Sequence, residues 1–198
     1  EKYGGYVIAY NGTTVVNCKT GECIYNQMVP GEILSQVYNE AVKSGVSIAV
    51  YNDAAKEIIV GNGLNKYVEF DAVACDVAVK ESNDFVKTVN FGFNKILLSG
   101  EPDNMKNVEK HMLEMFGDKV NVFRSDPHFV ELLPKYVDKG VAVEKLMRYL
   151  GINREKVICV GDSINDMSML RYAGMGVAMG NAQDKVKQSA DYVTLSHD

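Results

Sequence analysis

Hydrophobic and polar positions along the chain follow the two periods that distinguish strands from helices. Short apolar or alternating runs bounded by turn residues predict strands at residues 6–10, 13–16, 23–27, 46–51, 57–60, 93–98, 120–124, 129–133 and 157–160. Apolar residues at helical spacing predict helices that begin near residues 30, 64, 102, 139 and 163. Residues 76–90 show neither period. The mixture of strands and helices predicts an α/β protein.

The most informative run is residues 157–166, in which an apolar strand ends abruptly in polar residues. Asp162, Asn165 and Asp166 follow the strand and fall in the first turn of the next helix. In open α/β sheets, ligands bind beyond the carboxyl ends of the strands. Carboxylate and amide oxygens are hard ligands, of the kind that Mg²⁺ prefers when it also holds a phosphate. The alternative interpretation is structural, with Asp162 or Ser163 as a helix N-cap and Asp166 favoured by the helix dipole.

Three further segments accompany this run in the order found in a known family. Residues 161–170 and 176–182 resemble the fourth motif of the haloacid dehalogenase superfamily, and more narrowly that of the Cof-type sugar-phosphate phosphatases. Residues 131–140, which include Lys139, resemble its third motif, and residues 190–194 resemble its tail. The resemblance implies a doubly wound parallel-sheet core with an inserted α+β cap domain. It places the core in residues 1–28 and 129–198 and the cap in residues 29–128.

The resemblance also implies a role for each matching residue. Asp162 matches a Mg²⁺ ligand, and Asp166 is expected in the same metal site, either contacting a metal-bound water or orienting Lys139. Lys139 is expected to neutralise charge on the phosphoryl group, and Asn165 to hydrogen-bond that group. Asn11 resembles an asparagine at the junction of core and cap, where it would touch the substrate or simply form a hairpin turn. The implied reaction is Mg²⁺-dependent hydrolysis of a small phosphorylated metabolite through an aspartyl-phosphate.

One family motif is missing from the chain. No Asp-x-Asp occurs in the 198 residues, although this motif supplies the nucleophile and the general acid in the family. We therefore expect a fragment of a longer phosphatase that lacks its N-terminal strands and is inactive by itself. A core without those strands would expose edges and apolar faces, and we expect it to self-associate or to rest on a partner segment. Two alternatives remain: a catalytically dead relative that binds a ligand or partner through its cap, and a sugar phosphomutase.

Composition and cysteine positions bear on the partners and the location of the protein. The net charge is −5 and no basic run offsets it, which argues against a nucleic-acid partner. No apolar stretch is long enough for a membrane span. Cys18 and Cys23 flank a predicted hairpin turn, where they could form a disulfide or half of a metal site, while Cys159 lies in a predicted core strand. We favour reduced thiols and a cytoplasmic location.

Overall fold

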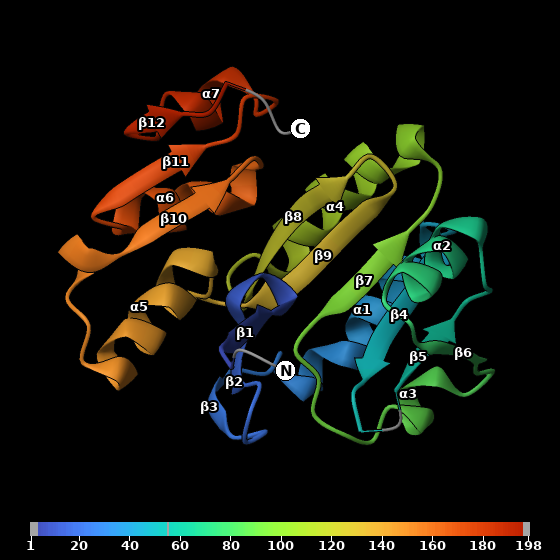
Figure 1. The fold of residues 1–198 in the computed structure, drawn as a ribbon. Helices are drawn as coiled ribbons and strands as arrows, with labels where there is room; N and C mark the ends of the chain where they lie inside the picture. Colours follow the sequence, from blue (N-terminus) through green and yellow to red (C-terminus); the bar gives the residue numbers. More distant parts are fainter. Residues whose placement is uncertain (1–3, 55, 196–198) are drawn as a thin grey trace. The chain divides into compact units, whose positions relative to one another are not determined.

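The computed structural model describes residues 4–54 and 56–195, and the chain divides into two compact units (Figure 1). Unit 1 combines Glu1–Gln27 with Tyr136–Asp198, and unit 2 is Met28–Lys135. The expected boundary after residue 128 therefore moves to residue 135. The physical reason is that residues 129–134 form a strand whose backbone pairs with two strands of unit 2.

Unit 2 is built on a mixed sheet with the strand order β6-β5-β4-β7-β9-β8. Only β5 and β6 are parallel within it, and the other neighbours are antiparallel. Its strands are β4 (Ser47–Asn52), β5 (Glu57–Gly61), β6 (Ala78–Glu81), β7 (Ile96–Ser99), β8 (Val120–Asp126) and β9 (Phe129–Pro134). Its helices are α1 (Leu34–Lys43), α2 (Lys66–Ala74), α3 (Phe85–Thr88) and α4 (Pro102–Phe116). The predicted strands at 46–51 and 57–60 are confirmed as the hairpin β4–β5, and the aperiodic stretch 76–90 contains β6 and α3.

The core of unit 2 follows from side-chain alternation along its strands. Every second residue of β4, β7 and β9 is a buried aliphatic side chain on one face of the sheet, and α1 and α4 pack their apolar stripes against that face. The side chains that form this core include Ile48, Val50, Ile96, Leu98, Val130, Leu132, Val37, Val108 and Met112.

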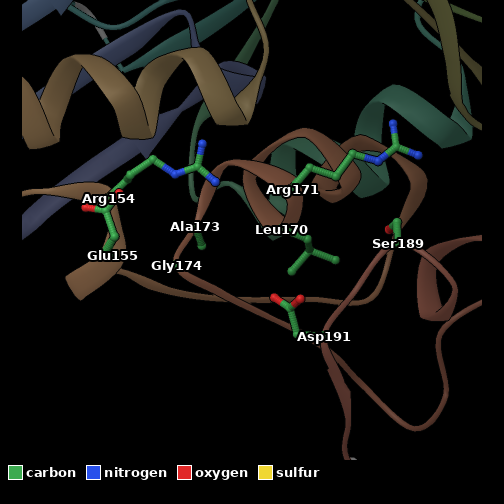
Figure 2. A pocket seen from close by; sticks show the side chains of 8 residues that line it. All are labelled: Arg154, Glu155, Leu170, Arg171, Ala173, Gly174, Ser189 and Asp191. Atoms are coloured by element: carbon green, nitrogen blue, oxygen red, sulfur yellow. The ribbon is translucent and has the colours of Figure 1, made fainter.

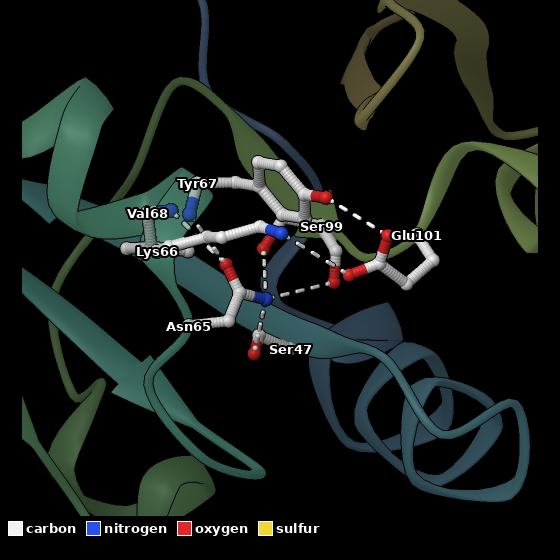
Figure 3. Close-up of polar contacts among 7 residues, drawn as sticks. All are labelled: Ser47, Asn65, Lys66, Tyr67, Val68, Ser99 and Glu101. Carbon is white, nitrogen blue, oxygen red and sulfur yellow. Dashed lines mark hydrogen bonds and ion pairs between the residues drawn. The ribbon is translucent and has the colours of Figure 1, made fainter.

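The start of α2 is fixed to this sheet by a network around Asn65 (Figure 3). The Oδ1 atom of Asn65 accepts hydrogen bonds from the backbone N–H groups of Tyr67 and Val68 at 3.0 and 3.1 Å, which makes Asn65 the N-cap. Its Nδ2 atom donates to Ser47 Oγ at 2.9 Å and to Ser99 Oγ at 3.0 Å. One side chain therefore caps a helix and joins it to two adjacent strands.

The described residues of unit 1 form two small sheets. One is antiparallel, with the order β1-β2-β3, and the other is parallel, with the order β10-β11-β12. The strands are β1 (Tyr6–Ala9), β2 (Thr14–Asn17), β3 (Cys23–Asn26), β10 (Ile158–Gly161), β11 (Met175–Ala178) and β12 (Tyr192–Val193). The helices are α5 (Lys139–Leu150), α6 (Met167–Tyr172) and α7 (Asp184–Lys187). Contacts with α5 unite the unit, because its Val143 packs with the parallel sheet and its Leu146 packs with the antiparallel one.

The parallel sheet departs in part from the expectation that residues 157–160 form a core strand. In the part of the chain that the structure describes, β10 is the edge strand of its sheet. Cys159 faces the core formed with α6, whereas Ile158 and Val160 are 64% and 53% exposed. The exposed apolar edge agrees with the expectation above, while self-association stays a prediction. No helix among the described residues has the length and apolar character needed to cross a bilayer.

Candidate active site

The loop that follows β10 carries three of the residues of the candidate site. It contains Asp162, Ser163 and a 3₁₀ turn, Ile164–Asp166, that leads into α6. The carboxylate of Asp166 points back toward the end of β10. Its Oδ2 atom accepts hydrogen bonds from the backbone N–H groups of Asp162 and Ser163, both at 3.0 Å. Gly161 makes this possible, since a Cβ there would lie 2.5 Å from the Cβ of Asp166. The glycine is therefore needed for the close approach of the acid to the strand.

The second component is Lys139, the first residue of α5. Asp138 is the N-cap of that helix and accepts from the backbone N–H of Val141 at 2.8 Å. A lysine at this position opposes the helix dipole, so a nearby anion is favoured. Asp166 provides it, because its Oδ1 atom lies 2.5 Å from Lys139 Nζ. The structure thus brings Asp166 and Lys139 into contact, and the role of Asp166 in orienting the lysine stays a prediction.

The two partners differ in exposure and in electrostatic environment. Asp166 has a side chain that is 5% exposed, and that of Lys139 is 30% exposed. Burial raises the pKa of Asp166, but the hydrogen bonds from Lys139 and from the backbone of Ser163 and Asp162 outweigh it, so the pKa is lowered on balance. Asp166 is therefore held as a carboxylate that fixes the lysine ammonium group at the site.

Asn165 lies in the same turn and reaches the hairpin turn near the N-terminus. Its Nδ2 atom donates to Asn11 Oδ1 at 2.8 Å, which brings together two residues that are 154 positions apart. Its Oδ1 atom is buried and has no hydrogen-bond partner among the described residues. A buried, unpaired amide oxygen is costly, so an external donor or a cation would satisfy it. Four of the predicted residues therefore meet directly in two pairs, Lys139 with Asp166 and Asn11 with Asn165.

These groups can be tested for their fit to Mg²⁺. Asp162 is solvent-exposed, and its Oδ1 atom accepts only a 3.3 Å hydrogen bond from Ser163 Oγ among the interactions of the described chain. Asp166 is engaged on both oxygens, so its carboxylate is poorly placed as a direct ligand. The described residues contain no group of three or more metal-binding side chains. Because Mg²⁺ usually keeps several waters and binds one or two carboxylates plus substrate, the donor set of Asp162 and the unpaired Asn165 oxygen fits part of such a site.

One contact in the site has no signal in the sequence. Ser168 Oγ accepts from the backbone N–H of Gly140 at 3.0 Å, which joins α6 to the first turn of α5. A single serine inside a helical stretch carries no pattern from which this contact could be inferred. Cys18 and Cys23, which could have formed a disulfide across the hairpin turn, are free, exposed thiols in the structure.

A separate hollow of about 500 Å³ lies elsewhere in unit 1 (Figure 2). Its lining includes Arg154, which precedes β10, Gly174, which precedes β11, and Asp191, which precedes β12. The hollow therefore lies where the parallel strands begin, whereas the acidic loop lies where β10 ends. It contains none of the residues of the candidate site.

Comparison with known proteins identifies the class of protein that this fold and site define. The family model for haloacid dehalogenase-like hydrolases matches residues 1–198. The chain belongs to that family, and the resemblance of its motifs to the family is confirmed.

Individual relatives agree with this assignment. A crystal structure of a haloacid dehalogenase-like hydrolase from Bacteroides thetaiotaomicron matches with a TM-score of 0.90 and 39% identity, over 98% of this chain and 72% of that one. A subclass IIB sugar phosphatase of the superfamily matches with a TM-score of 0.75 and 28% identity, over 96% and 69%. These matches confirm the α/β fold with a cap-like sheet insertion. A Haemophilus influenzae protein is 34% identical over 146 residues, and the matched region spans 68% of this chain and 55% of that relative.

Proposed function

We propose that the whole protein is a Mg²⁺-dependent phosphatase of small phosphorylated metabolites, with sugar phosphates as the first class to test. The observation that carries the proposal is the fixed Lys139–Asp166 pair beside Asn165 and Asp162 at the carboxyl end of β10. The similarity to a sugar phosphatase supports the choice of substrate class. The fold alone would not, because one fold serves many functions.

Each residue has a separate task in this proposal. Phosphoryl transfer spreads negative charge over the phosphoryl oxygens, and catalysis depends on positioning and on stabilising that charge. Lys139 places its ammonium group against those oxygens, and Asp166 keeps it there. Asn165 uses one N–H on Asn11 and has a second N–H for the phosphoryl group. Asp162 and the unpaired Asn165 oxygen are the groups that would hold Mg²⁺, which would supply further positive charge at the phosphate.

The nucleophile is not part of this sequence. An aspartate that attacks phosphorus would form an aspartyl-phosphate, and the family's Asp-x-Asp does not occur among the 198 residues. We propose that the remainder of the whole protein supplies it. The chain by itself is then expected to release no phosphate, while the whole protein releases it in the presence of Mg²⁺.

The test is phosphate release by the whole protein from a panel of phosphorylated sugars and related metabolites. In this assay Lys139→Ala should lower kcat by about 10²–10³-fold, the size of effect seen when one electrostatic stabiliser is removed. Lys145→Ala is the matched control, because Lys145 is an exposed lysine of the same helix with no ion pair among the described residues. Asp162→Ala should abolish the stimulation by Mg²⁺. A Lys139→Ala variant that changes only KM, or an Asp162→Ala variant that still responds to Mg²⁺, would contradict the assigned roles.

A further inference from the structure

The hairpin turn Tyr10–Gly12 has an unusual backbone for an ordinary surface turn. Tyr10, Asn11 and Gly12 all have positive φ, at 49°, 55° and 103°. Positive φ is costly for tyrosine and is only partly tolerated by asparagine, so three such residues in a row need support from their surroundings. Backbone strain of this kind is concentrated at functional sites.

The turn contacts both elements that carry the proposed catalytic groups. On one side, a Cβ on Gly12 would overlap the carbonyl of Asp138 and lie 3.0 Å from the backbone nitrogen of Lys139, so the two backbones are packed directly against each other. On the other side, Asn11 Oδ1 accepts the 2.8 Å hydrogen bond from Asn165 Nδ2. The turn therefore connects the start of α5 with the loop after β10.

The hydrogen bond to Asn11 determines what the Asn165 amide can offer. A primary amide has two N–H donors and one acceptor oxygen. With one donor committed to Asn11, the second donor and the unpaired Oδ1 atom are left for ligands. Rotating the Asn165 amide alone by 180° would place two oxygens against each other, so the acceptor oxygen of Asn11 favours the orientation in which Asn165 Nδ2 faces it.

We propose that Asn11 is a positioning residue that acts through Asn165, and not a residue that touches the substrate. The left-handed turn holds Asn11 against Asn165, while Gly12 keeps the turn in contact with the helix that carries Lys139. This proposal rests on the proposed function for its kinetic consequence. Its structural part, the orientation of the Asn165 amide by Asn11, is independent of any activity.

The discriminating variant is Asn11→Gly, because glycine adopts the same φ without strain while the side chain that accepts from Asn165 is removed. If Asn11 served only the turn, this change would be neutral. We expect kcat/KM of the whole protein to fall about threefold to tenfold, the effect of one lost neutral hydrogen bond. The matched control is Asp76→Gly, which removes an exposed side chain at another position of positive φ, 53°, in unit 2. The control should leave kcat/KM unchanged.

A double-mutant cycle with Asn165→Ala separates positioning from a general structural effect. Once Asn165 has been truncated, adding Asn11→Gly should change kcat/KM by less than about twofold, because the residue through which Asn11 acts is gone. An equal loss from Asn11→Gly in both backgrounds would overturn the proposal.

A measurement that does not depend on catalysis can be made on the 198-residue chain by itself. The side-chain NH₂ signals of Asn165 in nuclear magnetic resonance spectra should shift, and their exchange with solvent should accelerate, in Asn11→Gly. Asn11→Asp, which keeps an oxygen acceptor and tolerates positive φ, should retain the slow exchange. Unchanged Asn165 signals in Asn11→Gly would refute the positioning role. If the whole protein released no phosphate at all, the proposed function would fail while these spectra would still decide the role of Asn11.

Discussion

The ion pair between Lys139 and Asp166 is expected to stabilise unit 1 as well as to organise the site, and Asp166→Asn tests this. The substitution keeps the size of the side chain and leaves an oxygen that can still accept the two backbone hydrogen bonds from Asp162 and Ser163. The main loss is therefore the charge that faces Lys139 at 2.5 Å.

The magnitude follows from the exposure of the two partners. Removing one member of a buried ion pair costs about 3–5 kcal/mol, because the other charge is left without compensation. Asp166 is 5% exposed, but Lys139 is 30% exposed and retains part of its hydration. We therefore expect the free energy of unfolding of unit 1 to fall by about 2–3 kcal/mol, below the value for a fully buried pair.

The assay must report on unit 1 separately, because the chain contains two units that need not unfold together. Hydrogen–deuterium exchange of peptides from α5 and β10, followed in increasing urea, provides this reading. Asp162→Asn is the control, since Asp162 is exposed and its substitution should change the stability by less than about 0.5 kcal/mol.

A cycle with Lys139→Met tests whether the two residues act as a pair. Lys139→Met alone leaves the buried Asp166 charge uncompensated, and the double variant removes both charges. The double variant should therefore be at least about 1 kcal/mol more stable than the sum of the single losses predicts. Stability of Asp166→Asn within the range of the Asp162→Asn control, or additive losses in the cycle, would refute this account of the pair.

Two further predictions concern unit 2. Asn65→Ala should lower the free energy of unfolding of this unit by about 2–3 kcal/mol, because it removes an N-cap and the hydrogen bonds from Asn65 to Ser47 on β4 and Ser99 on β7. Urea unfolding read by hydrogen exchange in α2 measures this loss, and a loss below about 0.5 kcal/mol would contradict it. The pKa of Glu40 is lowered by its hydrogen bonds to Lys43 and His111, so this pair of contacts stabilises the fold above pH 4.5 and is lost as the pH falls through the lowered pKa. Glu40→Gln should therefore flatten the loss of unit 2 stability on acidification, whereas Glu32→Gln, an exposed control, should leave the wild-type pH profile.

The local structure could largely be predicted from the sequence, because periodicity and turn residues act over short distances. The helix from Pro102 and the pairing of β4 with β5 follow directly from the pattern. No element is predicted in residues 76–90, because β6 and α3 are each four residues long, which is too short to establish a period. The expected domain boundary differs from the observed division of the chain for another reason. A strand at residues 129–134 fits either unit, and its partners β7 and β8 are not encoded in its own sequence.

The candidate site shows the same division between local and long-range information. The sequence places Asp162, Asn165 and Asp166 together because they share one loop. It could name Lys139 only by resemblance, since the distance of 2.5 Å to Asp166 depends on the packing of α5 against α6. The bond from Asn165 to Asn11 spans almost the whole chain, and no periodicity or turn rule can predict it.

The two acids of the loop show how a fold assigns different tasks to the same side chain. Asp162 and Asp166 are four residues apart and have the same side chain. Gly161 allows Asp166 to approach the end of the strand closely, and its carboxylate is buried there. Lys139 donates to one of its oxygens and two backbone N–H groups donate to the other. Asp162 stays at the surface with oxygens open to a cation. Because a carboxylate saturated by donors is a poor metal ligand and an open one is a good ligand, the environment assigns Asp166 to hold Lys139 and makes Asp162 the proposed metal ligand.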